Sequence, residues 1–378
     1  MRILTVGPTG VVAMQRVLSW LADHGDDVWV VDEEETYRGL VPEGFRFTAL
    51  LLPSEPEVSL AVRLDAAATE LRRIADEFRP DLVHLHNVTA LGLACVQAGL
   101  GPLLVSTWGA LAQRAGQTEL ELPEATRQTL AAADGLIVDA PTLIAPAQAL
   151  AKPGALVALV PMGADTQRFR PGRTEAALVW RTLFGIPDDA FVLLSPRMWG
   201  GFYRHQAILQ AYVQAFSRFD RPTRLALVGL GDGPEALPHM AAAWEPVARS
   251  AAAGAVRWLP RIGYAEMPTL YAMCDAVISY PEIDSFAATL VEAAACELPV
   301  ITPLLPTYHG TFVEMACTLV APGSMEALVE AMASVVNQPA AQRSVVLAEA
   351  RAIVARDYDD EVTRQRLWSL YSELMKGA

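Results

Sequence analysis

The sequence of 378 residues lacks clustered cysteines, and this absence excludes several classes of protein. Its four cysteines are scattered, and each lies in an apolar stretch, so they form no metal-ligand pattern. The spacing instead favours buried free thiols in a reducing compartment. The four residues are Cys95, Cys274, Cys296 and Cys317.

Long apolar runs are also missing. The chain contains no run of ~18 apolar residues, the length that a helix needs to cross a bilayer. At the start of the chain, Gly7-Pro8 interrupts a short uncharged run, unlike the pattern of a signal peptide. We therefore expect a cytoplasmic protein without a transmembrane segment, for which shallow peripheral membrane association stays open.

Positive charge is scarce. The formal net charge is −14, which argues against nucleic acid as the main partner, because phosphate backbones need clustered Lys and Arg. Apolar residues make up 52% of the chain and charged residues 19%, so the chain can build large cores and is not disordered. This length fits two domains of ordinary size.

Short apolar runs alternate with helical patterns along the whole chain, which predicts parallel sheets covered by helices on both faces. Expected strands of the first half are Arg2–Val6, Val28–Val31, Asp81–His86, Pro102–Ser106, Asp134–Val138 and Ala155–Val160. Expected strands of the second half are Val192–Ser195, Leu225–Val228, Val256–Leu259, Ala276–Ser279 and Pro299–Thr302. The sequence thus predicts an α/β protein with two doubly wound, Rossmann-like halves.

Ligands of parallel α/β sheets lie beyond the carboxyl ends of the strands, where helix N-termini favour phosphate. The turn after the first expected strand is Gly7-Pro8-Thr9-Gly10. It is not the dinucleotide fingerprint, because Ala13 stands where a third glycine is required. The turn either lets backbone approach a ligand or serves only tight strand-to-helix packing.

Arg197 follows the expected strand that ends at Ser195, in the glycine-containing loop Pro196–Arg204. Arginine suits two-point contact with phosphate oxygens. The alternative is an ordinary solvated arginine.

Asp284 and Glu292 lie eight positions apart, about two helical turns. Asp284 and Ser285 are good N-cap types, so we expect the following helix to begin there. One carboxylate could accept hydrogen bonds from ribose hydroxyls while the helix N-terminus holds a diphosphate. The alternative is that Asp284 only caps the helix and Glu292 lies on a solvated face, although its neighbours are apolar.

The segment from Asp284 to Ile301 resembles the Glu-x7-Glu motif of retaining glycosyltransferases with the GT-B fold, specifically the large family four. That motif typically reads Glu-Gly-Phe-Gly-x-x-x-x-Glu-Ala-Met-Ala-Cys-Gly-x-Pro-Val-Ile. Asp284 stands for the first Glu and Ser285 for the first Gly, whereas Phe286 and Glu292 match directly. Glu297 replaces the usual Gly.

Other segments resemble the same family in the same order. Asp81–His86 looks like its "D-x-V-H-x-H" strand, and Pro161–Asp165 with Phe169 and Pro171 looks like its interdomain signature. The segment 228–234 is similar to its "V-G-x-G-P" strand end, and Met267–Asp275 to the helix before the motif.

The resemblance implies a nucleotide-sugar donor bound in a cleft between the domains. The implied organisation is an acceptor-binding domain at 1–168, a donor-binding domain at 169–355 and a last helix within 356–378 that crosses back to the first domain. Arg197 would bind the diphosphate, Glu292 the ribose, and Asp284 with the following backbone the sugar. The full implied donor side is Gly10, Arg197, Tyr203, Arg204, Ile262, Asp284, Ser285, Phe286, Ala287, Leu290 and Glu292.

Two departures from the family pattern concern the chemistry. The family's lysine, five or six residues past the arginine, is absent: Tyr203 is its positional match and Arg204 a candidate substitute for the charge. Many members also carry a His near the anomeric carbon, where this chain has Trp108-Gly109, expected on the acceptor side. Trp108 cannot act as a general base, so His86 joins Asp284 and Arg197 as a catalytic candidate.

The implied reaction is metal-independent transfer of a hexose-type sugar with retention of configuration, with no cofactor beyond the donor. A UDP-sugar is expected in preference to a GDP-sugar, and the acceptor could be a sugar, a lipid-linked molecule or a small molecule. Two alternatives stay open. One is a glycosyltransferase-like accessory protein that binds a nucleotide without turnover, and the other is a nucleotide-sugar epimerase of the same fold.

Overall fold

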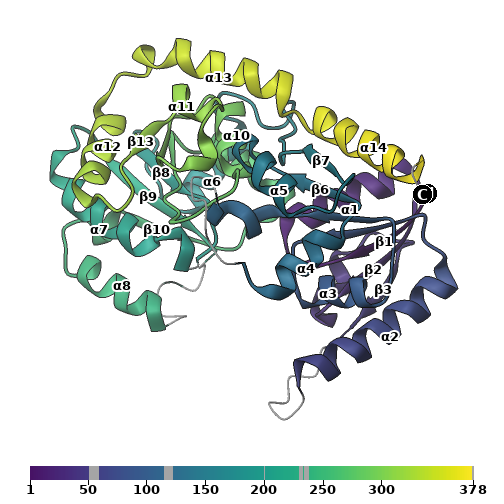
Figure 1. Cartoon of the computed structure of the whole chain (residues 1–378). Helices are drawn as coiled ribbons and strands as arrows, with labels where there is room; N and C mark the ends of the chain where they lie inside the picture. Colours follow the sequence, from purple (N-terminus) through teal and green to yellow (C-terminus); the bar gives the residue numbers. More distant parts are fainter. Residues whose placement is uncertain (51–58, 115–121, 200, 230–232, 234–237, 377–378) are drawn as a thin grey trace. The chain divides into compact units, whose positions relative to one another are not determined.

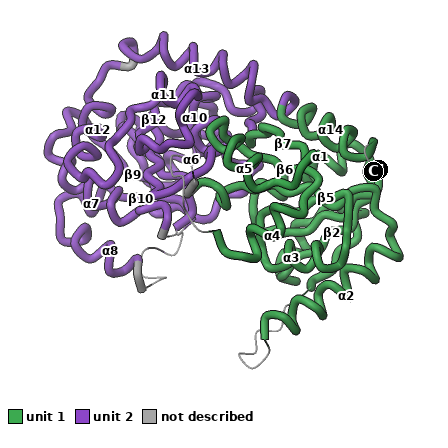
Figure 2. Tube along the Cα trace, viewed as in Figure 1, with its two compact units in different colours: residues 1–162, 363–378 green, residues 163–362 purple. Residues whose placement is uncertain are grey.

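The computed structural model describes residues 1–50, 59–114, 122–199, 201–229, 233 and 238–376. Contacts divide the chain into two compact units. Unit 1 consists of Met1–Met162 with Thr363–Ala378, and unit 2 of Gly163–Val362 (Figure 2). The sequence-based boundaries at 168 and 355 fall within unit 2, close to its two ends. The chain thus leaves unit 1, builds unit 2 and returns to unit 1.

Unit 1 is built on a seven-stranded sheet in the order β3-β2-β1-β4-β5-β6-β7, in which every pairing is parallel (Figure 1). Its strands are β1 Arg2–Val6, β2 Asp27–Asp32, β3 Arg46–Ala49, β4 Leu82–His86, β5 Leu103–Ser106, β6 Gly135–Val138 and β7 Leu156–Leu159. All six predicted strands of this half are present. β3 was not predicted, because its half-buried residues alternate too weakly to stand out.

Helices connect these strands, as parallel neighbours require. The helices before residue 163 are α1 Val12–His24, α2 Leu60–Phe78, α3 Ala90–Gln97, α4 Glu124–Ala132 and α5 Ile144–Leu150. α1 ends as predicted at Gly25, whose φ of 79° is the left-handed conformation that glycine adopts without a side-chain clash.

Unit 2 is built on a six-stranded sheet in the order β10-β9-β8-β11-β12-β13, again parallel at every pairing. Its strands are β8 Phe191–Ser195, β9 Thr223–Val228, β10 Val256–Leu259, β11 Ala276–Ile278, β12 Val300–Pro303 and β13 Thr318–Val320. The five predicted strands of this half are present, and the short β13 is additional. The two parallel sheets confirm the predicted α/β class.

The helices of unit 2 pack against its sheet and contribute to its apolar core. They are α6 Glu175–Leu183, α7 His205–Ala215, α8 Pro238–Ala248, α9 Met267–Ala272, α10 Ala288–Ala295, α11 Val313–Ala316, α12 Met325–Asn337 and α13 Ser344–Asp357. α7 and α12 bury residues such as Leu209, Tyr212 and Met332 in one apolar cluster with strands β8, β9 and β11. This packing fixes the first turn of α7, which lies beside the candidate site described below.

The last helix, α14 (Asp360–Lys376), belongs mostly to unit 1. Leu367, Leu370 and Leu374 pack in the same apolar cluster as Ile3 and Met14. The hydroxyl of Tyr371 lies 2.6 Å from Nδ1 of His84, which is fully buried in β4. Residues from the two ends of the chain therefore share one core.

No helix among the described residues is long and apolar enough to span a bilayer.

The contact between His84 and Tyr371 generates a stability prediction. Tyr371→Phe removes a buried hydroxyl and leaves His84 Nδ1 without this partner, so we expect the free energy of unfolding to fall by about 1–2 kcal/mol. Denaturant titration followed by circular dichroism measures this change. Ser369→Ala is the control, because Ser369 is exposed and its hydroxyl donates to the carbonyl oxygen of Gln365 within α14 itself. Equal stability of Tyr371→Phe and the parent protein would contradict the role of this contact.

Candidate active site in unit 2

The strand order of unit 2 reverses between β8 and β11. β8 continues to β9 on one side, whereas β11 continues to β12 on the other. Such a switch point leaves a crevice at the carboxyl ends of the two strands, where open α/β sheets bind their ligands. Arg197 follows β8 and Asp284 follows β11, so both predicted residues leave the sheet at this point.

Arg197 and Asp284 form an ion pair. Nη2 of Arg197 lies 3.1 Å from Oδ2 of Asp284, and the two side chains are only 15% and 11% exposed. A charge removed from water this far is costly unless an opposite charge accompanies it. The sequence placed both residues in one site, and the structure brings them into direct contact.

Tyr203 packs on the same guanidinium. The guanidinium carbon of Arg197 lies 4.1 Å from the centre of the Tyr203 ring, within the range of a cation–π contact. Burial works against the charge of Arg197, but the carboxylate of Asp284 and the neighbouring tyrosines outweigh it, so the pKa of Arg197 is raised. The guanidinium is thus held between an anion and an aromatic face.

His205, the first residue of α7, fixes the backbone of the loop. Its Nε2 donates a hydrogen bond of 3.0 Å to the carbonyl oxygen of Arg197, and its ring stacks on Trp199 at 4.7 Å. Because the carbonyl can only accept, the proton of the neutral ring lies on Nε2. Burial lowers the pKa of His205 to about 4, so the ring is neutral at neutral pH.

The prediction that Asp284 and Ser285 cap the following helix is wrong. α10 begins at Ala288 with Ala287 in the N-cap position and no side-chain cap. Asp284 instead uses Oδ1 to accept from its neighbour's backbone, Ser285 N, at 3.0 Å, while Oδ2 faces Arg197. Its carbonyl oxygen accepts from Oγ1 of Thr307 at 2.9 Å. The loop, not the helix, therefore orients this carboxylate.

Glu292 lies inside α10 and is only 5% exposed, which excludes the alternative of a solvated-face residue. The hydroxyl of Tyr271 donates to its Oε2 at 2.8 Å. Burial, together with the charge of Glu292, raises the pKa of Tyr271 well above its usual value, which keeps this hydroxyl protonated as a donor. Glu292 is thus a buried carboxylate with a fixed orientation.

Of the remaining predicted donor residues of unit 2, two are partly exposed and four are buried. Arg204 pairs with Glu282 at 3.2 Å and Ile262 is partly exposed after β10. Ser285, Phe286, Ala287 and Leu290 are buried. The ring of Phe286 stacks on Tyr358 at 5.3 Å. For Phe286, the structure therefore shows a packing role.

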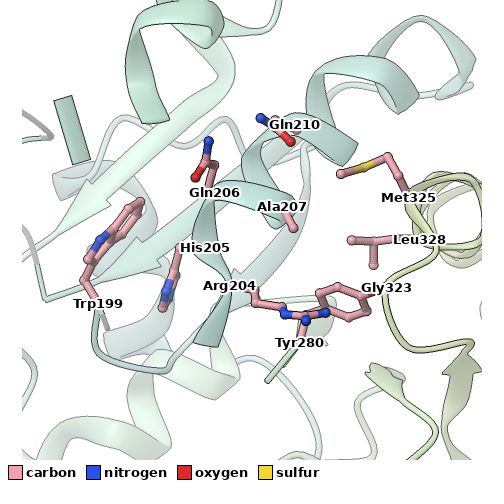
Figure 3. A pocket seen from close by; sticks show the side chains of 10 residues that line it. All are labelled: Trp199, Arg204, His205, Gln206, Ala207, Gln210, Tyr280, Gly323, Met325 and Leu328. Atoms are coloured by element: carbon pink, nitrogen blue, oxygen red, sulfur yellow. The ribbon is translucent and has the colours of Figure 1, made fainter. Parts of the chain in front are cut away.

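The loop before α7 also lines a cavity of about 670 Å³. Figure 3 shows Trp199 beside His205 on one side of it, and Arg204 and Tyr280 among the other lining side chains. The other lining residues are Gln206, Ala207, Gln210, Gly323, Met325 and Leu328. Of the predicted donor residues, Arg204 lines this cavity.

In unit 1, the turn after β1 holds two glycines with packing roles. A Cβ on Gly7 would lie 2.5 Å from the carbonyl oxygen of His86, and one on Gly10 would lie 2.7 Å from the ring of Tyr37. Gly7 therefore needs glycine because its neighbour is backbone, whereas the atoms near Gly10 belong to the end of the Tyr37 side chain. The predicted contact of Gly10 with phosphate stays a prediction.

His86 is completely buried at the end of β4. Its ring lies 3.9 Å from that of His84 and 5.7 Å from that of Trp108, and burial lowers its pKa to about 3. A side chain without exposed surface has no direct access to a substrate, which argues against the predicted catalytic contact. Trp108 is partly exposed with a φ of 37°, and Gly109 beside it is exposed, as an acceptor-side role would require.

Three residues of this neighbourhood were missed in the sequence. Thr307, Tyr308 and His205 all follow strands of the same sheet, at the same edge as Arg197 and Asp284. Burial, and then the charge of Asp284, raise the pKa of the fully buried Tyr308. Applying the strand-end rule to polar residues after β12 would have found two of them. Gly200 and residues 230–232 and 234, which the sequence analysis included, lie outside the described residues.

The four cysteines are free, as predicted, and all but the half-buried Cys317 are buried. Within the described ranges, no group of three or more His, Cys, Asp or Glu side chains could hold a metal ion.

Comparisons with known families agree with this arrangement. The family described as glycosyl transferases group 1 matches residues 199–351, and the glycosyl transferase 4-like domain matches residues 9–163. This chain belongs to the group 1 glycosyltransferases. The two matches together cover most of both units. The first includes Asp284 and Glu292, and the second includes Gly10 and Trp108.

A curated relative is the D-inositol 3-phosphate glycosyltransferase of Corynebacterium urealyticum, 26% identical over 222 residues. The match covers 58% of this chain and 52% of the relative, so the chain spans about half the length of the curated relative it matches.

Solved structures show the same GT-B fold. The sucrose-phosphate synthase of Thermosynechococcus elongatus has a TM-score of 0.77 at 18% identity and full coverage of both chains. The HepE protein of Anabaena, solved with UDP and glucose, has a TM-score of 0.75 at 17% identity. The comparison covers 99% of the present chain and 100% of HepE.

The buried His205 generates a pH prediction. Its folded pKa of about 4 lies below the unfolded value of ~6.5, so its contribution to stability is present above pH 6.5 and is lost as the pH falls toward 4. Glutamine keeps an N–H donor but does not titrate. His205→Gln should therefore flatten the fall of unfolding free energy between pH 6.5 and 4 by up to about 1.4 kcal/mol per pH unit. Urea titrations at several pH values measure the slope, and identical slopes for variant and parent would contradict the prediction.

Proposed function

We propose that the protein is a retaining glycosyltransferase that moves a hexose-type sugar from a nucleoside-diphosphate sugar to an acceptor without a metal ion. The observation that carries the proposal is the placement of Arg197 beside Asp284 at the switch point of unit 2. A guanidinium at this position can neutralise a diphosphate, and the adjacent carboxylate can accept hydrogen bonds from sugar hydroxyls.

In the proposed reaction, the bond between the anomeric carbon and the diphosphate oxygen breaks, and the acceptor oxygen forms a bond on the same face of the sugar. The diphosphate leaves with the bonding electrons and takes the acceptor's proton. Arg197 stabilises the charge that develops on the leaving group, which is the stage at which electrostatic stabilisation lowers the barrier. Asp284 orients the sugar, and Glu292 holds the ribose.

The nucleotide of the proposed donor is UDP. Structures of the HepE protein with UDP, with UDP-glucose, and with UDP and glucose support this choice, because they share the fold of this chain over nearly its whole length. Unit 2 is the proposed donor-binding part, since it holds Arg197, Asp284 and Glu292.

A second candidate function is that of an accessory protein that binds the nucleotide without turnover. The observation that favours it is the chemistry of two positions: Tyr203 and Trp108 stand where related enzymes carry a lysine and a histidine. Calorimetry and donor-hydrolysis assays with UDP-sugars separate the two functions. Tight binding of UDP without transfer or hydrolysis would support the accessory role.

The phosphate role of Arg197 predicts a binding defect. Arg197→Ala should weaken UDP binding by about 1.5–3 kcal/mol, the range for hydrogen bonds to charged groups. Isothermal titration calorimetry measures the affinity. Arg249→Ala is the matched control, because the Arg249 side chain, just after α8, is 70% exposed and forms an ion pair with Glu245 of that helix. If Arg197→Ala binds UDP as tightly as the control variant, Arg197 is not part of the site.

The ribose role of Glu292 predicts a change in selectivity. The parent protein should bind UDP more tightly than its 2′-deoxy analogue, and Glu292→Gln should reduce this preference by about 1 kcal/mol, because a neutral amide accepts a weaker hydrogen bond than a carboxylate. Glu330→Gln, at an exposed position, serves as the control. Equal affinity of the parent protein for the two nucleotides would refute the assignment. A companion variant, Asp284→Asn, should lower turnover more than binding.

A further inference from the structure

Tyr203 contacts Arg197 through the face of its ring. The guanidinium carbon lies 4.1 Å from the ring centre. A guanidinium carries five N–H donors, and a contact with the face of an aromatic ring does not use them. The Tyr203 side chain also raises the pKa of Arg197 through a hydrogen bond, so at most part of this donor set is used by Tyr203. Asp284 approaches the same guanidinium as an ion-pair partner, with Oδ2 lying 3.1 Å from Nη2.

The backbone beneath this contact is held independently. His205 donates from Nε2 to the carbonyl oxygen of Arg197, and the ring of His205 lies edge-to-face with that of Tyr203 at 6.4 Å. Trp199 stacks on His205 from within the same loop. His205 therefore holds the backbone at Arg197 and supports the ring of Tyr203 from the start of a helix.

We propose that Tyr203 is a positioning residue for Arg197 and not itself a ligand of the donor. Its ring holds the guanidinium in one orientation beside Asp284 and leaves in-plane N–H donors available for diphosphate oxygens. A cation at this position would add charge to the site but would repel Arg197, whereas the ring attracts it. This inference rests on the proposed function, in which Arg197 binds the diphosphate.

The first experiment compares Tyr203→Leu, which removes the aromatic face, with Tyr203→Phe, which removes only the hydroxyl. With UDP as the probe in calorimetry, Tyr203→Leu should weaken binding about threefold to thirtyfold, the range that corresponds to a cation–π contact. Tyr203→Phe keeps the ring and loses only the hydroxyl contact with Arg197, so it should lose clearly less affinity than Tyr203→Leu. Equal losses in the two variants, or no loss in Tyr203→Leu, would overturn the proposal.

A double-mutant cycle tests whether Tyr203 acts through Arg197. In the Arg197→Ala background, Tyr203→Leu should have no further effect on UDP affinity, because the side chain that it positions is gone. A direct ligand would cost the same in both backgrounds, and that result would also overturn the proposal. If UDP binds the parent protein but Arg197→Ala has no effect, the proposed role of Arg197 fails instead.

Crystal structures of the ligand-free variants make the test independent of any nucleotide. The guanidinium of Arg197 should keep its place beside Asp284 in Tyr203→Phe and should lose that single orientation in Tyr203→Leu. An unchanged guanidinium in Tyr203→Leu would overturn the positioning role even if no nucleotide bound to the parent protein.

Discussion

The ion pair between Arg197 and Asp284 is the constraint on which the site in unit 2 depends. Two charges that are largely removed from water are tolerated only while they face each other, because an unpaired buried charge costs several kcal/mol. Their contact ties together two loops that follow neighbouring strands, β8 and β11. Replacing the pair with apolar residues could leave the fold intact, so stability alone does not explain its presence. The proposed function accounts for it, because a diphosphate donor would meet a guanidinium that is already oriented.

The sequence predicted most of the fold because the chain is locally consistent. Buried parallel strands appear as short apolar runs, and helical spacing between them leaves few topologies open. β3 and β13 were not predicted. They are short strands of four and three residues at the sheet edges, and their partly buried residues show little apolar pattern. The predicted start of α10 was wrong. Asp284 has a side chain that often caps helices, but here its carboxylate contacts Arg197 and the backbone N–H of Ser285 instead. At this position, the ion pair with Arg197 outweighs the local preference of Asp284 for an N-cap.

Prediction of the site divides in the same way. Arg197, Asp284 and Glu292 could be found from the sequence, because residues after parallel strands converge at one sheet edge and because a family motif fixes their spacing. The contacts that orient them could not be found in this way. The stacking of Tyr203 on Arg197 and the bond from Tyr271 to Glu292 join residues whose neighbourhood only the packed structure defines. His86 is a different case: its place at a strand end suggested chemistry, the structure shows a fully buried side chain, and its catalytic role stays a prediction.

The return of α14 to unit 1 has a consequence for biosynthesis. The strands of unit 1 leave the ribosome first, but Leu367, Tyr371 and Leu374, which complete their core, emerge only after the whole of unit 2. Unit 1 therefore exposes the surface that α14 will cover until the last residues of the chain have emerged. A polypeptide cut short before Leu367 would carry all of unit 2 beside an unfinished unit 1. Cellular quality control could recognise such a product by that uncovered apolar surface.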